Sequence, residues 1–227
     1  MAGIHDGHRD RLRETFMKTG LDDFHPHNVL ELLLFYSIPR KDTNEIAHAL
    51  IEEFGSIERV FDADVEELVK VKGITKNSAV LISMIPQLAR YYMTRKADHG
   101  KPLKTIEELG SYLVPKFIGE NHEILYLVFL DSKLQVLTCK KLVEGTTNSV
   151  EMRIDQIVKL AATVDAPRLA IAHNHPDGNP TPSPEDLALT AGLKEALKLI
   201  NKELVDHVVV GDDQFMSIIS LLDMDSF

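Results

Sequence analysis

The stretch 171–186 constrains this chain more than any other part of its sequence. An apolar run, 168–172, leads into it and predicts a buried strand, at whose end His173 and His175 follow. Because residues two positions apart in an extended backbone point to the same side, we expect the two imidazoles to be presented together. The next residues exclude regular structure but keep the segment stiff: Pro176, Gly178, Pro180, Pro182 and Pro184.

Ser183 stands near the end of this segment and has the sequence pattern of a helix N-cap. Proline follows it directly and Asp186 stands three residues further, so a long helix is predicted over 184–201. The strand end thus presents two histidines, the helix start presents one aspartate and one serine, and a stiff loop connects them. Such a preorganised set of side chains is typical of a metal site.

The set of donor atoms decides which metal ions fit. Two neutral imidazoles and one carboxylate suit a divalent ion, most often Zn²⁺, and three protein ligands leave a fourth position for water. Ferrous iron in an oxygenase is the alternative for the same donors. The simpler explanation is a capped helix, whose dipole favours Asp186, beside structural histidines. Two alternating histidines are harder to explain by packing, so we predict a metal site of His173, His175 and Asp186.

The spacing of these residues resembles a family signature. His-x-His, seven residues, Ser, two residues and Asp is the pattern of the JAMM (MPN+) metalloproteases, and here it comprises His173, His175, Ser183 and Asp186. The residues around this signature are similar to those of the RadC family, a bacterial branch of that fold, except at Asp177, where that family usually carries Ser. The N-terminal part of the chain also resembles RadC proteins, so the resemblance covers nearly the whole sequence.

A hydrolase of this kind needs a general base that takes the proton from the attacking water. The resemblance implies a glutamate just before the first long strand of the domain. Glu123 matches that position, because the predicted strand 124–130 follows it. Glu120, Glu144 and Glu151 are the competing carboxylates.

The resemblance also implies a second role for Ser183. Besides capping the helix, its hydroxyl would donate a hydrogen bond to the developing oxyanion. Asp206 and His207 lie on a predicted buried strand, 204–211, and match an Asp-His pair of the family. As a fourth ligand His207 would close the site, so we interpret it as a structural residue or one that supports a ligand.

The composition, 44% hydrophobic and 26% charged, is that of an ordinary soluble globular chain. No apolar stretch reaches about 18 residues, so no membrane span is predicted, and the start at Met1 lacks the pattern of a signal peptide. Cys139 is the single cysteine, which excludes an internal disulfide and favours a cytoplasmic location. A formal net charge of −10 argues against a broad nucleic-acid-binding face.

Two domains are predicted, an all-helical domain over 1–96 and an α/β domain over 105–227. The polar residues 97–104 between them form the linker. The α/β domain should contain a mixed sheet flanked by helices, and the resemblance implies the JAMM/MPN arrangement, with layers like those of cytidine deaminases. The predicted strands are 124–130, 134–143, 168–172, 204–211 and 215–218, and the predicted helices are 105–116, 152–164 and 184–201.

The turn around Gly73 resembles a helix-hairpin-helix, whose second helix binds DNA phosphates through backbone N–H groups. Lys70, Lys72 and Lys76 flank this turn. Thr75 stands where the usual Gly-x-Gly turn has its second glycine, and a side chain there restricts a close approach to phosphate. We therefore expect no more than weak DNA binding from the N-terminal domain.

Together these features predict a zinc-dependent hydrolase with Glu123 as base and then acid. The resemblance implies that the bond cleaved is a peptide or isopeptide bond of an unidentified protein substrate. Two alternatives stay open. The first is a metal-dependent DNA-processing protein, because RadC proteins have been associated with DNA repair. The resemblance of 173–175 to HNH nucleases is superficial, since those enzymes spread the motif across a ββα unit. The second alternative is a non-catalytic DNA- or protein-binding module with a vestigial metal site.

Overall fold

The structure is a computed structural model that describes residues 6–97, 100–142 and 150–224. Its contacts divide the chain between Ala89 and Arg90 into two compact units. This division lies within a long helix, α6 (Lys76–Ala97), and precedes the linker predicted at 97–104. Because each unit has its own apolar core, the two are described separately.

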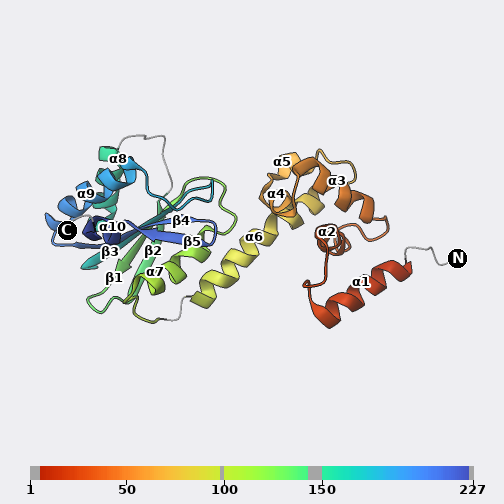
Figure 1. Cartoon of the computed structure of the whole chain (residues 1–227), viewed down its shortest axis with the longest axis horizontal. Helices are drawn as coiled ribbons and strands as arrows, with labels where there is room; N and C mark the ends of the chain where they lie inside the picture. The colour runs from red at the N-terminus through yellow and green to blue at the C-terminus, as the bar shows by residue number, and fades with distance from the viewer. Residues whose placement is uncertain (1–5, 98–99, 143–149, 225–227) are drawn as a thin grey trace. The chain divides into compact units, whose positions relative to one another are not determined.

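The first unit is all helical, as predicted for this part of the chain (Figure 1). Its core consists of buried aliphatic side chains from successive helices, among them Leu30, Leu34, Leu50 and Ile82. The helices are α1 (Asp6–Thr19), α2 (Pro26–Leu34), α3 (Asn44–Phe54), α4 (Ile57–Asp62), α5 (Val65–Leu68) and the first part of α6.

The hairpin between α5 and α6 turns at Gly73. This residue has a φ of +99°, and a Cβ there would lie 2.8 Å from the side chain of Ile46, so both conformation and packing require glycine. The hydroxyl of Thr75 accepts a 3.2 Å hydrogen bond from the backbone N–H of Ser78 and thereby caps α6. The lysines that flank the turn are exposed: Lys70, Lys72 and Lys76.

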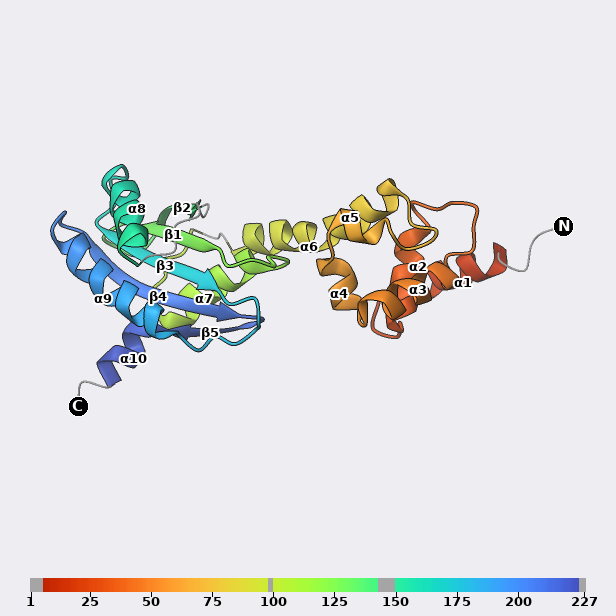
Figure 2. The same ribbon diagram turned by 90° about the horizontal axis from the view of Figure 1, so that it is seen from above.

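The second unit contains a five-stranded mixed sheet flanked by helices, which confirms the predicted fold class (Figure 2). The strand order is β2-β1-β3-β4-β5; β3 and β4 are parallel, and the other neighbouring pairs are antiparallel. The strands are β1 (Leu125–Leu130), β2 (Val136–Leu142), β3 (Arg168–Asn174), β4 (Glu203–Gly211) and β5 (Gln214–Ser217). The helices are α7 (Ile106–Leu113), the 3₁₀ helix η1 (Val114–Phe117), α8 (Val150–Ala162), α9 (Pro184–Lys198) and α10 (Ile218–Met224).

Helices cover both faces of this sheet, α8 and α9 on one and α7 with η1 on the other (Figures 1 and 2). Alternate residues of each strand enter different cores: Leu127 and Ile171 pack beneath α8 and α9, whereas Val128 and Val208 pack beneath α7. His173 lies two residues beyond Ile171 on β3. The alternation therefore directs its side chain to the face that α9 covers.

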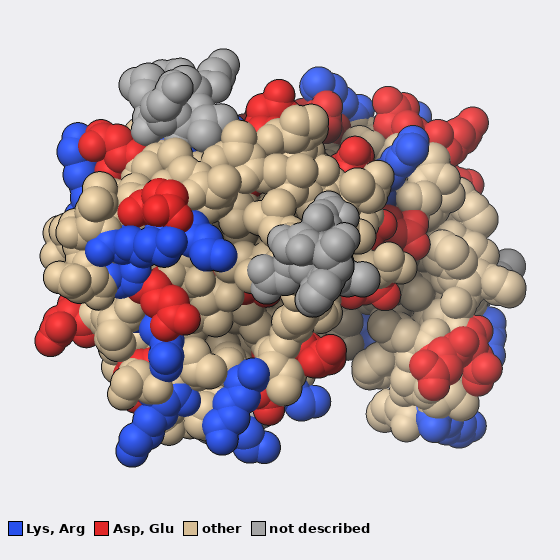
Figure 3. All heavy atoms as spheres, turned by 60° about the vertical axis from the view of Figure 1, so that its left-hand side comes forward, with Lys and Arg blue, Asp and Glu red and all other residues tan. Residues whose placement is uncertain are grey.

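The surface carries charges of both signs. The formal net charge of the chain is −10, and on the face shown in Figure 3 acidic and basic side chains are interspersed. Within the described part of the chain, no helix combines the length and the hydrophobicity that a membrane span requires.

Candidate metal centre

Three side chains converge where β3 ends and α9 begins. The Nε2 atoms of His173 and His175 are 3.1 Å apart; Asp186 Oδ1 is 3.2 Å from the first, and Asp186 Oδ2 is 3.5 Å from the second. His173 and Asp186 are buried and His175 is half-buried. Among the described residues, these three form the one group of at least three His, Cys, Asp or Glu side chains that could hold a metal ion.

The separations within this group fit a tetrahedral divalent ion. Zinc–ligand distances of about 2.0–2.1 Å in a tetrahedron separate neighbouring ligand atoms by about 3.3 Å. The Nε2–Nε2 separation of 3.1 Å and the separation of 3.2 Å between His173 Nε2 and Asp186 Oδ1 lie close to that value, whereas the 3.5 Å from His175 Nε2 is measured to the other carboxylate oxygen, Oδ2. Two imidazoles and one carboxylate also leave one coordination position for a substrate or water, so the donor set fits an open metal site.

A hydrogen bond to the backbone orients His175. Its Nδ1 lies 2.8 Å from the carbonyl oxygen of Asn179. Because a carbonyl can only accept, Nδ1 carries the hydrogen, and Nε2 is left with the lone pair that a metal ligand needs. The backbone N–H of His175 also donates to the carbonyl of Val210 at 2.8 Å, which fixes this residue at the end of the sheet.

Asp186 is held by the N-cap of its own helix. The backbone N–H and the hydroxyl of Ser183 donate to Asp186 Oδ2 at 2.8 and 2.6 Å, and the backbone N–H of Asp186 donates back to the Ser183 hydroxyl. Burial alone would raise the pKa of the Asp186 carboxyl, but the neighbouring His173 and the bonds from Ser183 lower that pKa well below its usual range. The carboxylate therefore stays ionised, with Oδ1 facing His173 and Oδ2 held by Ser183.

The loop that joins the two ends of the site lies against the turn after β4. A Cβ on Gly178 would collide with the carboxylate of Asp212, and a Cβ on Gly211 would collide with the backbone of Gly178 and Pro180. Gly178 has a φ of +82°, which also favours glycine. This close contact explains how a loop without regular structure can hold the two ligand sets at a fixed separation.

His207 is completely buried on β4 beside His173. Its Nε2 lies 2.9 Å from His173 Nδ1, and its Nδ1 lies 2.6 Å from the hydroxyl of Thr190 on α9. Burial, and next to it the neighbouring His173, hold the pKa of His207 well below its usual value, although Asp186 acts in the opposite direction. Asp206 does not join this group, because it accepts hydrogen bonds from the His207 backbone and from Ser217.

The segment before β1 carries Glu123 and is fixed by Asn174. The side-chain oxygen of Asn174 accepts from the backbone N–H of Ile124 at 2.8 Å, and its nitrogen donates to the carbonyls of Glu120 and His122. Leu125 pairs with His173 across β1 and β3, so the same register continued by two residues places Glu123 opposite His175. Sequence reasoning missed Asn174, since its partners lie about fifty positions away.

The carboxylates that compete for the role of base differ in their partners. Arg153 of α8 approaches Glu123 at 3.5 Å, and the Glu123 side chain is 38% exposed. Glu120 instead pairs with Arg90 at 2.6 Å and with Lys141 at 3.1 Å, and its side chain is only 15% exposed. Glu144 and the side chain of Glu151 lie outside the described residues.

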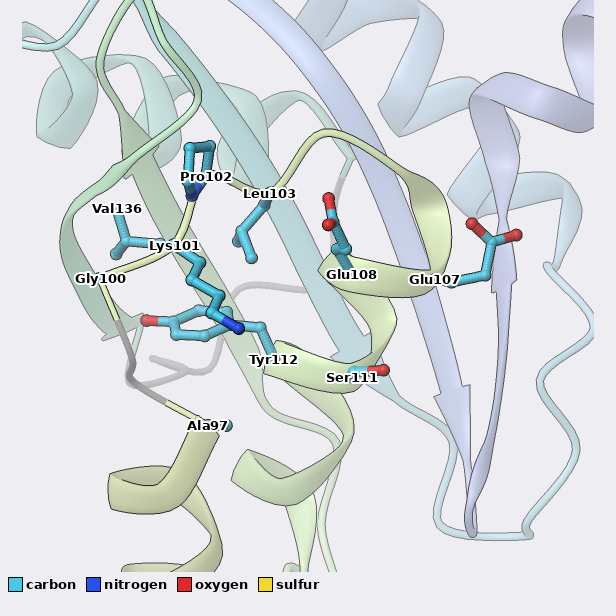
Figure 4. A pocket seen from close by; sticks show the side chains of 10 residues that line it. All are labelled: Ala97, Gly100, Lys101, Pro102, Leu103, Glu107, Glu108, Ser111, Tyr112 and Val136. Atoms are coloured by element: carbon cyan, nitrogen blue, oxygen red, sulfur yellow. The ribbon is translucent and has the colours of Figure 1, made fainter.

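A cavity of about 310 Å³ lies elsewhere, between the start of α7 and β2 (Figure 4). Lys101, Glu107, Tyr112 and Val136 contribute to its lining. None of the predicted site residues lines it, so the metal centre is not defined by this cavity.

The chain is similar to known proteins over most of its length. Residues 103–223, more than half of the chain, match the family described as the RadC-like JAB domain. UPF0758 protein FN0909 of Fusobacterium nucleatum is 32% identical over 218 residues, which are 93% of this chain and 94% of that protein. A UPF0758 protein of Pseudomonas savastanoi pv. phaseolicola is 30% identical over 210 residues, 92% of this chain and 94% of its own. With the His-His-Asp cluster inside the matched region, the chain belongs to the RadC family.

Proposed function

We propose that this protein is a zinc-dependent hydrolase that cleaves a peptide or isopeptide bond by JAMM-type chemistry. The JAB domain and the His-His-Asp cluster indicate a metal-dependent hydrolase. The observation that carries the proposal is the convergence of two imidazole nitrogens and an ionised carboxylate, with contacts of 3.1–3.5 Å between them. The half-buried position of His175 leaves this group open to a substrate.

His173, His175 and Asp186 would hold the ion through two Nε2 atoms and Oδ1. When bound, zinc supplies Lewis-acid polarisation of a carbonyl and lowers the pKa of water towards about 7. Cys139 on β2 is not among the converging residues.

Glu123 would take the proton from the attacking water and pass it to the leaving amine. Its carboxylate suits that task because it is partly exposed and its contact with Arg153, at 3.5 Å, is long for an ion pair. Asn174 fixes the backbone on both sides of Glu123, so the carboxylate is attached to a defined support although the side chain itself is not buried. Glu120 is unsuited, since two cations already bind its carboxylate.

Ser183 would donate a hydrogen bond to the oxyanion that forms at the attacked carbonyl. Its single hydroxyl hydrogen is bound to Asp186 Oδ2 at 2.6 Å in this structure. The backbone N–H of the same residue donates to the same oxygen at 2.8 Å. The hydroxyl can therefore turn towards an oxyanion while the backbone bond continues to hold Asp186.

A peptide-library digest tests the proposal. The purified chain is stripped of metal with a chelator, reloaded with zinc, and incubated with the library and with linear and branched peptides, beside His175→Ala treated in the same way. We expect cleavage by the reloaded wild type alone, because the variant has lost one of the three proposed ligands and should not hold zinc.

Two outcomes would contradict the proposed function. Zinc-loaded wild type that cleaves DNA oligonucleotides but no peptide would show a DNA-processing enzyme. Zinc-loaded wild type that cleaves neither class would indicate a non-catalytic module that retains its metal.

A further inference from the structure

We infer that Thr190 and His207 set the tautomer of His173, so that His173 Nε2 carries its lone pair towards Asp186 and His175. Thr190 and His207 would thus be positioning residues for a metal ligand. This inference rests on the proposed metal centre, but its test includes a measurement on the metal-free protein.

The assignment begins at the backbone of α9. The Thr190 hydroxyl lies 2.6 Å from the carbonyl oxygen of Asp186, one helical turn earlier. A carbonyl oxygen can only accept, so Thr190 is the donor in this bond. Thr190 is completely buried, and His207 Nδ1 is the other atom within reach of that hydrogen; we assign the hydrogen to the carbonyl, which has no hydrogen of its own to offer.

The direction of the next two bonds follows from the first. Having used its hydrogen, the Thr190 oxygen must accept from His207 Nδ1, which lies 2.6 Å away. His207 is 0% exposed, and burial disfavours a second, charging proton on its ring. His207 Nε2 is then an acceptor, and the 2.9 Å bond to His173 must be donated by His173 Nδ1. One neutral tautomer of His173 satisfies this chain, with the hydrogen on Nδ1 and the lone pair on Nε2.

The reverse direction would oppose metal binding. If His207 Nε2 carried the hydrogen, His173 Nδ1 would accept it, and the His173 proton would lie on Nε2. That proton would point at Asp186 Oδ1, 3.2 Å away, and would occupy the position of the ion. The Thr190 hydroxyl is therefore the group that excludes the unproductive tautomer.

His175 provides an internal comparison. A backbone carbonyl, that of Asn179, fixes its Nδ1 hydrogen, and no side-chain substitution removes that acceptor. His173 depends on two side chains from two other elements, α9 and β4. The tautomer of His173 can therefore be altered by mutation while that of His175 stays unchanged.

The experiment uses the full-length protein and the pair Thr190→Val and Thr190→Ser. Valine keeps the branched shape and removes the hydroxyl, whereas serine keeps the hydroxyl and removes the methyl group. Long-range ¹H–¹⁵N spectra of the metal-free proteins give the tautomer of each histidine ring, and competition with a chromophoric chelator gives the zinc affinity.

We expect the His173 hydrogen on Nδ1 in the wild type and in Thr190→Ser. In Thr190→Val we expect it on Nε2, with a zinc affinity about 10–100-fold lower, the usual effect of removing a group that orients a metal ligand. The His175 tautomer should be the same in all three proteins.

Several results would overturn the inference. One is a wild-type spectrum with the His173 hydrogen on Nε2, which decides the matter even if Thr190→Val does not fold. Another is a zinc affinity of Thr190→Val equal to that of Thr190→Ser, whether both are normal or both are reduced. A wild type that binds no zinc but shows the expected tautomer would contradict the proposed function and leave the hydrogen-bond assignment supported.

Discussion

The two ends of the candidate site are built differently. At the ligand end, bonds of 2.6–2.9 Å from Asn179, Ser183 and His207 hold each converging side chain before any ion is bound. At the other end, the Glu123 side chain is 38% exposed, and Arg153 lies 3.5 Å from its carboxylate. The ligands are thus preorganised, whereas the proposed base keeps the freedom to receive a proton and release it.

This contrast suggests that metal binding and catalysis can be separated by mutation. Changes at the ligand end should remove the ion, and with it the activity. Changes at Glu123 should remove activity and leave the ion in place. The following predictions test that separation, from the largest expected effect to the smallest.

The largest effect is expected for His175→Ala. Two protein ligands remain, so the purified variant should contain less than about one tenth of an equivalent of zinc and show no hydrolysis. Elemental analysis after dialysis provides the measurement. Asp177→Asn is the matched control in the same loop, because Asn keeps the acceptor for the Asn179 backbone N–H and removes no cluster residue. A zinc content of His175→Ala equal to that of Asp177→Asn would refute this assignment.

Glu123→Gln should reduce hydrolysis by about 10²–10⁴-fold, the usual contribution of a positioned general base. Glutamine keeps the size of the side chain but cannot take up a proton at neutral pH. Because Glu123 is not among the converging ligands, the zinc content should stay at the wild-type level. Initial rates on a peptide found in the library digest, normalised to bound zinc, give the result.

Glu120→Gln is the control for this comparison, three residues away. It should leave the rate within about threefold, but it should lower the free energy of unfolding by roughly 1–2 kcal/mol, because Arg90 and Lys141 lose a charged partner at a partly buried site. The base is misassigned if Glu123→Gln stays active while Glu120→Gln or Glu144→Gln is inactive.

The α/β unit should fold without the helical unit. Fragments 90–227 and 105–227 both contain every proposed ligand, and we expect both to melt cooperatively and to bind zinc. The shorter one lacks the contacts of Arg90 with Glu120 and with the Ile118 carbonyl, so its melting temperature should be lower by about 3–6 °C. A shorter fragment without a cooperative transition would mean that the linker predicted at 97–104 does not separate two independent domains.

The smallest effect concerns DNA binding by the helical unit. The exposed Lys70, Lys72 and Lys76 flank a turn whose Thr75 side chain limits the approach of phosphate, and the chain is acidic overall. We predict dissociation constants no tighter than about 10⁻⁶ M at physiological salt, weakened further by Lys72→Glu combined with Lys76→Glu. Fluorescence anisotropy that gives nanomolar affinity, unaffected by the double substitution, would show a different binding surface.

The strands and the His-His-Asp cluster could be predicted because their signals are local. The strand expected at 168–172 extends to Asn174 in the structure, and the helix expected at 184–201 ends at Lys198. The alternation of His173 with His175 and the capping box of Ser183 and Asp186 are readable from neighbouring residues, and the structure brings these side chains together as expected.

The supporting residues could not be predicted, because their partners are far apart in sequence. Thr190 and His207 are seventeen positions apart, and neither has a local pattern that points to the other. The sequence predicts His207 only as a structural or supporting residue, and its contact with His173 depends on the parallel pairing of β3 with β4. The sequence predicts only that Asn174 faces away from the two histidines. Its role follows from the fold, which places the segment 120–124 beside it.

The central claim is that His173, His175 and Asp186 bind zinc, and X-ray absorption at the zinc edge of the purified full-length protein tests it most directly. We predict about one zinc per chain in a four-coordinate shell with two imidazole nitrogens at about 2.0–2.1 Å and the remaining positions filled by oxygen. A protein that binds no zinc, or a spectrum with a sulfur ligand or a six-coordinate shell of oxygen without imidazole, would contradict the account.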